Sequence, residues 1–317
     1  MVDVRSYIPG DEYGIVQLWN ICLENDQIQQ KRFRNMVILD ENFDPEGLKV
    51  AVKEDTIIGA LYAVRRQTPF YKNIMNEEDS WITFFFVHPD QRRKGIGTSM
   101  FNEAQKFLKK SGVKNLYFSS YTPNYFVPGI DKEAYPIGYE FLRAHEFRKL
   151  YSCVAMDKNL VNFKMSESIK KSLLLRRSEG YSFDYVSDKD FYELVTFASN
   201  EFNPDWGRAI REAVLKDISY NQIIIVKNKE EKIVGFSMFG GYETIQTRFG
   251  PIGIASNEQG NKLGNILLNL SLKEMVKSNL HSSWFLWTGE KSPAGQLYSK
   301  LGFKVTREFH VMFQTIS

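Results

Sequence analysis

Hydrophobic positions along the chain switch repeatedly between a helical and a strand spacing, and this alternation predicts an α/β protein with helices layered on a sheet. In the first half, apolar residues recur at three- and four-residue intervals in three segments, 11–23, 97–110 and 138–145. Short runs rich in β-branched and aromatic residues predict four strands, 48–52, 57–64, 81–87 and 113–119. The first half therefore predicts a sheet with helices packed against it.

The second half of the chain repeats this order of elements. Helical spacing returns in 187–202, 264–276 and 294–300, and strand-like runs occupy 222–226, 233–239, 249–255, 284–288 and 304–314. Equivalent positions carry the same residue in three places: Gly59 and Gly235, Gly97 and Gly264, Phe147 and Phe303. We expect duplication of a whole domain, with an N-terminal domain over 1–160, a polar, basic and helical connector over 161–179, and a C-terminal domain over 180–317.

Composition and charge exclude several classes of protein. The 317 residues suffice for about two domains, and a 14% share of aromatic residues argues against a disordered chain. A net charge of +3 is too small to predict nucleic-acid binding. No apolar run is long enough to span a membrane, the N-terminus lacks a signal pattern, and Cys22 and Cys153 cannot build a disulfide framework. We therefore expect a cytoplasmic protein that binds neither nucleic acid nor membranes.

The segment with the clearest chemistry follows the predicted strand at 81–87. It runs Val87-His88-Pro89-Asp90-Gln91-Arg92-Arg93-Lys94-Gly95-Ile96-Gly97-Thr98 and enters the helix at 97–110. Glycines at such a junction let successive backbone N–H groups point into one concavity, and the helix N-terminus adds positive partial charge. Three adjacent cations add full charges, which favours a phosphate-binding loop over a solvated basic turn that merely caps the helix. The pattern is neither a Walker A motif nor a dinucleotide fingerprint.

This segment resembles the acetyl-CoA loop of the GCN5-related N-acetyltransferase (GNAT) superfamily, whose signature is Arg/Gln-x-x-Gly-x-Gly/Ala. Arg92-Arg93-Lys94-Gly95-Ile96-Gly97 matches that signature throughout, and two further segments, Val4–Asp11 and Leu297–Phe303, are similar to the family's opening strand and late helix-to-strand motif. The resemblance covers nearly the whole chain and implies two tandem GNAT-like domains, each a central mixed β-sheet flanked by helices. It also implies that acetyl-CoA binds between two parallel strands that part, with Phe86 and Val87 giving backbone hydrogen bonds and Arg92 through Thr98 holding the pyrophosphate.

The two halves depart from the family pattern in opposite ways. In Gln259-Gly260-Asn261-Lys262-Leu263-Gly264, Lys262 stands where the first signature glycine belongs. Its side chain either blocks the phosphate or reaches it, so we expect an empty or weakened cofactor site in the second half. Tyr298 aligns with the tyrosine that often protonates the CoA thiolate in the family, or else is a packed core residue. In the first half Leu142 takes that place, so the half with the better loop lacks the usual acid.

A long loop after the predicted strand at 113–119 offers a substitute. It runs from Ser120 to Asp131 and lies at the C-terminal end of a strand, where open α/β sheets present their sites. Tyr121, Tyr125 and Asp131 are candidate acceptor-binding residues, and either tyrosine is a candidate acid; the alternative is an ordered loop whose aromatic residues pack inward. The four histidines lack metal-ligand spacing, so we predict no metal site.

These features favour an acetyl-CoA-dependent N-acyltransferase that uses the first-half cofactor site. By the resemblance, the amine of a small molecule or a peptide amino terminus attacks the thioester directly, which requires a base or water chain and an acid for the leaving thiolate. Two alternatives stay open: a non-catalytic CoA-binding protein that acts as a sensor or scaffold, and catalysis in the second half through Tyr298. Because two domains in one chain can mimic the family's dimers, we expect a monomer or a homodimer.

Overall fold

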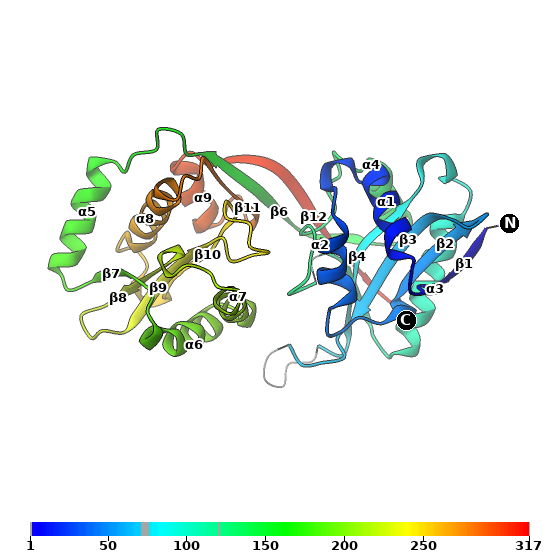
Figure 1. Ribbon diagram of the computed structural model, residues 1–317, viewed down its shortest axis with the longest axis horizontal. Coiled ribbons are helices and arrows are strands. Elements are labelled where there is room, and N and C mark those ends of the chain that lie inside the picture. Colours follow the sequence, from blue (N-terminus) through cyan, green and yellow to red (C-terminus); the bar gives the residue numbers. More distant parts are fainter. Residues whose placement is uncertain (1, 71–75, 120, 317) are drawn as a thin grey trace. The chain divides into compact units, whose positions relative to one another are not determined.

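The computed structural model describes residues 2–70, 76–119 and 121–316, which form two compact units (Figure 1). Unit 1 consists of Met1–Cys153 together with Glu308–Ser317, and unit 2 of Val154–Arg307. The predicted mixed α/β fold with two similar repeats, each a sheet flanked by helices, is confirmed.

Unit 1 is built on a mixed sheet. Its first five strands are β1 (Asp3–Ser6), β2 (Leu48–Lys53), β3 (Thr56–Arg65), β4 (Asp79–Val87) and β5 (Asn115–Phe118). The strands β1 to β4 are antiparallel neighbours, and β5 lies parallel to β4. Its helices are α1 (Glu12–Cys22), the short α2 (Gln30–Phe33), α3 (Ile96–Lys110) and α4 (Pro136–Ala144).

Side chains of β4 divide the core of unit 1 between the two faces of the sheet. Phe84 and Phe86 pack in a cluster with α1, whereas Ile82 packs in a second cluster with α3 and α4. The register against β3 shifts so that Thr83 is an extra residue, a β-bulge that restores the alternation beyond it. We call these two sides of the sheet the α1 face and the α3 face.

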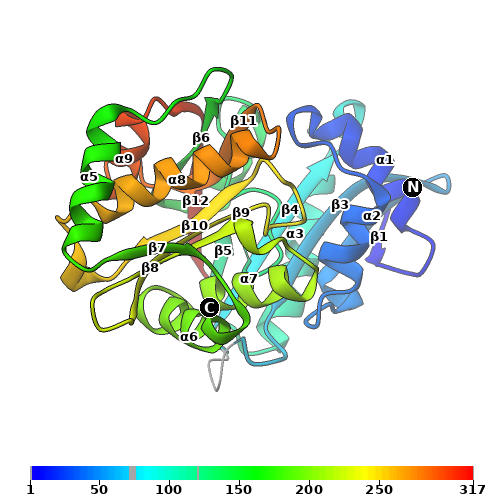
Figure 2. The ribbon, with the colours of Figure 1, turned by 60° about the vertical axis from the view of Figure 1, so that its left-hand side comes forward.

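Unit 2 repeats the plan. Its strands are β7 (Ser182–Tyr185), β8 (Ile223–Lys227), β9 (Ile233–Phe239), β10 (Phe249–Ile254) and β11 (Ser282–Thr288). Its helices are α5 (Glu167–Ser178), α6 (Phe191–Glu201), α7 (Pro204–Leu215), α8 (Leu263–Lys277) and α9 (Pro293–Lys300). Figure 2 shows α8 lying across the sheet with α5 beside it. The helix α5 begins at the N-cap Ser166 and lies within the range predicted as a helical connector.

Each unit is completed by a strand segment from the opposite half of the sequence. Two long strands, β6 (Arg148–Asn159) and β12 (Lys304–Thr315), each pass from one unit into the other. In unit 1, Met312–Thr315 pairs antiparallel with β5, and in unit 2, Val154–Asn159 pairs antiparallel with β11. The units therefore differ from the predicted domain ranges 1–160 and 180–317, because 154–160 belongs to unit 2 and 308–317 to unit 1.

Candidate functional site

The neighbouring parallel strands β4 and β5 of unit 1 pair over their first residues and then part. Their last paired residues are Ile82 and Phe118. Beyond that point β4 continues alongside β3 to Val87, whereas β5 ends. We call this parting point the unit 1 fork. The strand β4 therefore has one edge beyond the fork at which β5 does not bond.

The hydrogen-bond ladder decides which residues of β4 present their peptide groups to that edge. The His88 N–H donates to the Ile58 carbonyl oxygen at 2.8 Å, and bonded positions in an antiparallel ladder recur every second residue. Phe86 therefore directs its peptide groups toward β3, while Phe85 and Val87 direct theirs away from it. Of the two predicted backbone donors, Val87 directs its peptide groups toward the fork, whereas those of Phe86 bond to β3 within the sheet. The sequence pattern does not show strand register, so it did not indicate that the Phe85 peptide groups also point toward the fork.

The loop between β4 and α3 forms a concave row of backbone amides. A 3-10 turn over Pro89–Gln91 is followed by two left-handed residues, Arg93 with a φ of 60° and Gly95 with a φ of 79°. Gly95 caps α3, and a Cβ placed on it would have no heavy atom within 4 Å. In the described part of the chain, the amides from Arg93 through Thr98 donate to no backbone carbonyl. They are left to bind oxygens of a ligand at the positive end of α3.

The three cations of this loop have different roles. Arg92 Nε donates to the Val87 carbonyl oxygen at 3.0 Å, and Lys94 Nζ donates to the Asp90 carbonyl oxygen at 2.7 Å. Arg93 is exposed and makes no hydrogen bond or ion pair with the described residues. Arg92 and Lys94 therefore hold the loop in shape, and Arg93 is the cation available to a phosphate.

The thiol of Cys22 contacts the end of β4, where the loop begins. Cys22 at the end of α1 is buried, and its Sγ lies 3.5 Å from the Val87 carbonyl oxygen, which also accepts from Arg92. Burial raises the pKa of the Cys22 thiol to about 11, so it stays protonated and acts as a donor at neutral pH. Because the Val87 carbonyl oxygen already accepts two hydrogen bonds, the Val87 N–H is the group that can bind a ligand at the fork.

The corresponding loop of unit 2 keeps the same backbone conformation despite its different sequence. Gln259 has φ and ψ of −66° and 154°, against −66° and 160° for Arg92. Lys262 is left-handed with a φ of 61°, like Gly95, at a cost of about 1 kcal/mol for a residue with a side chain. Within the described residues, the amides from Gly260 through Asn265 again donate to no backbone carbonyl. The lysine therefore leaves the shape of the loop intact.

The charge of the two loops differs more than their shape. The unit 2 loop contains no arginine, and its Glu258 carboxylate accepts from the Tyr181 hydroxyl at 2.6 Å and from Asn261 Nδ2 at 3.3 Å. The unit 1 loop sets Arg92, Arg93 and Lys94 against Asp90, whereas the unit 2 loop sets only Lys262 against Glu258, so it attracts a diphosphate less. We therefore expect the unit 2 loop to bind a diphosphate more weakly than the unit 1 loop.

Tyr298 of α9 lies beside the point where β10 and β11 part, which we call the unit 2 fork. The strands β10 and β11 meet in a parallel bridge between Arg248 and Trp284. The next residues, Phe249 and Phe285, have ring centroids 6.4 and 4.4 Å from that of Tyr298. The tyrosine is buried, and burial raises the pKa of its phenol well above its usual value, so it keeps its proton at neutral pH. It is therefore a packed core residue placed where its strands part.

The predicted acceptor-binding residues of unit 1 lie in different surroundings. Tyr121 is buried on the α1 face, where its hydroxyl accepts from Asn42 Nδ2 at 2.6 Å and donates to Asp40 Oδ1 at 3.2 Å. Asp131 is also buried, and its Oδ1 accepts two backbone N–H groups of the turn before α4. Tyr125 is half-buried. Asp131 therefore has a clear part in shaping the loop, while the acceptor-side and acid roles of the tyrosines stay predictions.

The loop that carries these residues is anchored to β12. Ile130 and His310 exchange two backbone hydrogen bonds of 2.9 and 2.8 Å. Gly129 is so close to this strand that a Cβ on it would stand 2.3 Å from the His310 carbonyl oxygen. Ser120, the first residue of the predicted loop, lies outside the described residues. The C-terminal segment of the chain therefore fixes the end of the loop at Ile130, which packs in the α3-face cluster, whereas Tyr121 and Phe126 earlier in the loop pack on the α1 face.

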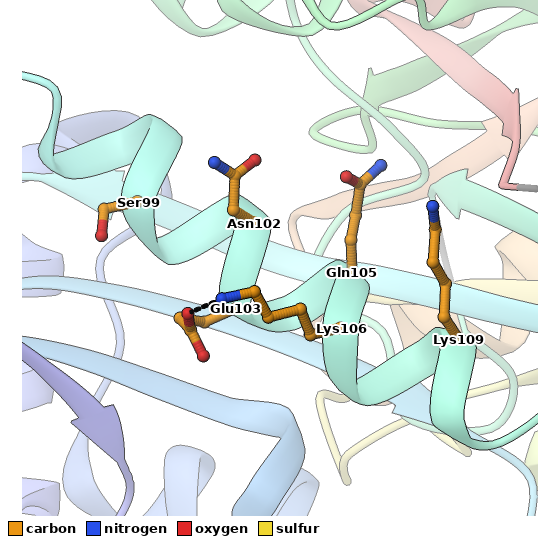
Figure 3. A pocket seen from close by; sticks show the side chains of 6 residues that line it. All are labelled: Ser99, Asn102, Glu103, Gln105, Lys106 and Lys109. Atoms are coloured by element: carbon orange, nitrogen blue, oxygen red, sulfur yellow. Dashed lines mark hydrogen bonds and ion pairs between the residues drawn. The ribbon is translucent and has the colours of Figure 1, made fainter.

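A hollow on the outer side of α3 begins one residue past the amide row (Figure 3). Its lining side chains all come from α3 and are Ser99, Asn102, Glu103, Gln105, Lys106 and Lys109. Glu103 and Lys106 form an ion pair of 2.7 Å. Among the described residues that line it there is no histidine, cysteine or tyrosine. The hollow is lined by one helix alone and has neither the free amide row nor the open strand edge, so the fork is the candidate active site.

Metal-binding clusters and membrane-spanning helices are both absent from the described ranges 2–70, 76–119 and 121–316. In these ranges no three histidine, cysteine, aspartate or glutamate side chains lie close enough together to hold a metal ion. No helix in the same ranges is both long and apolar enough to cross a membrane.

Comparison with solved structures places this geometry among known folds. The chain is similar over 99% of its length, with a TM-score of 0.80 and 17% identity, to a protein described as a GCN5-related glucosamine N-acetyltransferase region in a fungal multi-domain GH3 beta-N-acetylglucosaminidase, of which it spans 38%. It is similar over 99% of its length to a GCN5-related N-acetyltransferase from Sphaerobacter thermophilus (TM-score 0.69, 14% identity, 96% of that chain). A tandem GNAT protein from the clavulanic acid biosynthesis pathway matches over the full chain (TM-score 0.65, 12% identity, 99% of that chain). At these identities the likeness shows the fold.

Sequence comparison identifies the family. No curated protein sequence matches the chain, but the family model described as "Acetyltransferase (GNAT) family" matches it twice, over residues 14–126 and 189–303. The two matches contain the two forked strand pairs and the two amide-lined loops. This family comprises acyl-CoA-dependent N-acetyltransferases and typically uses acetyl-CoA. The chain belongs to the acetyltransferase (GNAT) family, with one copy of its fold in each repeat.

Proposed function

We propose that this protein transfers an acetyl group from acetyl-CoA to the amine of a small molecule or to a peptide amino terminus, with the cofactor bound at unit 1. The observation that carries the proposal is the row of free amides from Arg93 through Thr98, next to the edge of β4 beyond the unit 1 fork. Amides at a helix N-terminus bind phosphate oxygens, and an open strand edge binds an extended chain of amides. Together they match the pyrophosphate and the pantetheine arm of coenzyme A.

The residues of the site divide the work of binding and positioning. The amide row and Arg93 hold the diphosphate, and the open space at Gly95 lets it approach the backbone. The peptide groups of Phe85 and the N–H of Val87 pair with the pantetheine amides. Bound there, acetyl-CoA supplies the thioester whose acyl carbon forms the new bond to nitrogen as its bond to sulfur breaks. The protein contributes mainly by fixing the two reactants in place and by backbone donors at the carbonyl oxygen.

Removal of the open cation should weaken cofactor binding without harming the fold. We expect Arg93→Ala to raise the Kd for coenzyme A by about 5-fold, because one exposed charge-assisted contact to phosphate contributes about 1 kcal/mol. The thermal midpoint should not move, since Arg93 makes no hydrogen bond or ion pair with the described residues. Calorimetric titration of coenzyme A measures the Kd. The control is Lys109→Ala, an exposed cation farther along α3; equal Kd values for wild type and Arg93→Ala would contradict the assignment.

A second candidate function is catalysis at unit 2. It is favoured by one observation: unit 2 keeps the loop conformation and also has a protonated tyrosine, Tyr298, beside its fork, whereas unit 1 has Leu142 at the equivalent position. In this version the buried phenol would donate a proton to the leaving thiolate. The lower positive charge of the loop is the argument against it.

Replacement of Tyr298 by phenylalanine distinguishes the two units. With catalysis at unit 1 we expect Tyr298→Phe to keep kcat within about 3-fold of wild type, whereas loss of a general acid lowers kcat by about 100-fold or more. The measurement is release of free thiol from acetyl-CoA with a panel of primary amines. Tyr220→Phe, which removes an exposed hydroxyl of the same unit, is the control. A loss of about 100-fold would move the active site to unit 2, and tight coenzyme A binding without amine-dependent thiol release would favour a non-catalytic CoA-binding protein.

A further inference from the structure

A buried polar cluster lies on the α1 face of unit 1, close to the fork. It consists of Asp40, Asn42, Tyr62, Tyr121 and Asn124, and we call it the Asp40 cluster. Exposure of its members is 8% for Asp40, 4% for Asn42, 2% for Tyr62 and 1% for Tyr121. Polar groups this deeply buried normally satisfy one another completely. Two members of the cluster do not.

The first is the Asp40 carboxylate, which has no cation. Its Oδ1 accepts from the Asn42 backbone N–H at 2.7 Å and from the Tyr121 hydroxyl at 3.2 Å, and its Oδ2 accepts from Asn124 Nδ2. Among the described residues it makes no ion pair. A carboxylate offers about four acceptor positions, so one on Oδ2 is open. A buried carboxylate that only neutral donors contact gains from a cation.

The second is the Tyr62 hydroxyl, which is shielded from solvent and has no hydrogen-bond partner in the described ranges of the chain. Burial raises the pKa of Tyr62 well above its usual value, and the nearby Asp40 carboxylate raises it further. The phenol is therefore neutral. The Asp44 backbone N–H lies near its oxygen without completing a hydrogen bond, and a phenol oxygen can accept a further N–H. A buried hydroxyl without a partner costs about 1–3 kcal/mol, and an N–H from a ligand at this oxygen would remove that cost.

The position of the cluster fits the second substrate of a transfer reaction. Tyr121 follows the end of β5 by three residues, and its ring centroid lies 5.3 Å from that of Trp81, the residue of β4 just before the last paired position. Tyr62 lies opposite Phe84, just past the fork. The amide row and α3 lie on the other face of the sheet. A molecule bound at the cluster would thus reach the fork from the side opposite to α3.

We infer that Asp40 and Tyr62 form the ammonium-binding subsite for the acceptor, which is therefore a cationic amine. This inference rests on the proposed function. An ammonium group has three N–H donors, and the open position on Asp40 Oδ2 and the Tyr62 oxygen accept two of them. Asn124 is only half-buried, so its amide can leave Oδ2 to a charged donor without disturbing the core.

The test compares Tyr62→Phe and Asp40→Asn with Glu41→Gln, an exposed neighbour that loses the same charge as Asp40→Asn. We expect the KM for the acceptor amine to rise about 5-fold in Tyr62→Phe and more than about 10-fold in Asp40→Asn, with the KM for acetyl-CoA unchanged. Tyr62→Phe removes a hydroxyl that completes no hydrogen bond with the described residues, so its thermal midpoint should stay at or above that of wild type. Wild-type KM values for the amine in Tyr62→Phe would overturn the inference, even if Asp40→Asn unfolds.

A binding experiment separates this inference from the proposed function. Saturation-transfer NMR on the CoA-loaded full-length protein uses n-propylammonium as probe and 1-propanol as its uncharged analogue. We expect a signal for the ammonium alone, reduced in Asp40→Asn and in Tyr62→Phe but not in Glu41→Gln. That result without any turnover would refute the transferase and keep the subsite. Turnover of amines with equal ammonium signals in all four proteins would refute the subsite and keep the transferase.

Discussion

Replacement of Gly95 by aspartate is expected to weaken coenzyme A binding by about 100-fold, because a like charge set against a bound anion costs several kcal/mol. Gly95 has a φ of 79° and caps α3 in the middle of the amide row, so the new carboxylate would stand where the diphosphate binds. The oxygens of the new carboxylate would also accept hydrogen bonds from the loop amides that otherwise bind the diphosphate. Calorimetric titration of coenzyme A into wild type and variant measures the change.

The same substitution at the other end of α3 is the matched control. Gly112 has a φ of 76°, and a Cβ on it would also have no heavy atom within 4 Å. Gly112→Asp therefore introduces the same backbone strain, about 1 kcal/mol, and the same charge, away from the loop. We expect it to bind coenzyme A like wild type. If Gly95→Asp and Gly112→Asp bound coenzyme A equally well, the phosphate site would not be at this loop.

Deletion of residues 308–317 is expected to unfold unit 1 while unit 2 stays folded. This segment pairs with β5 and anchors the loop that ends at Asp131. Its buried apolar side chains are Phe309, Val311, Met312 and Ile316, each at most 5% exposed. Burial of such a side chain contributes about 1.5–3 kcal/mol, and a domain has only about 5–15 kcal/mol in all. Hydrogen exchange should show loss of protection in β2 to β5, retained protection in β8 to β10, and loss of coenzyme A binding.

A point substitution gives a graded version of this experiment. Met312 is fully buried in the core of the α3 face, so Met312→Ala should destabilise unit 1 by about 2–5 kcal/mol. Thr315→Ala, an exposed position of the same paired segment, should have little effect. If Met312→Ala sped hydrogen exchange in β8 to β10 and not in β2 to β5, the segment would stabilise unit 2 instead of unit 1, which would contradict the prediction.

Local patterns predicted most of the elements but not the exchange of strands between the repeats. The segment 304–314 was recognised as a strand from its own residues, and β12 is that strand. Its partner β5 lies almost 200 residues earlier, and the apolar pattern of a strand does not specify which distant edge it joins. The predicted C-terminal domain 180–317 therefore contains the residues that complete unit 1.

The candidate site shows the same limit at the level of single residues. The phosphate loop could be predicted because glycines, cations and a helix start lie within a dozen consecutive residues. That Lys262 adopts the backbone conformation of Gly95 could not, since a lysine is a poor predictor of left-handed geometry. Asp40 and Tyr62 carry no local signal: Asp40 meets Tyr121 only after the chain has folded, and Tyr62 reads from the sequence as an ordinary strand residue.

Hydrogen exchange of the loop amides with and without coenzyme A tests the central claim most directly. The account predicts that the amides from Arg93 through Thr98, which have no backbone acceptor in the described chain, exchange much more slowly when the cofactor is bound. The wider core of unit 1 should change little. Unaltered exchange in this row at saturating coenzyme A, or slowing confined to Gly260 through Asn265, would contradict it.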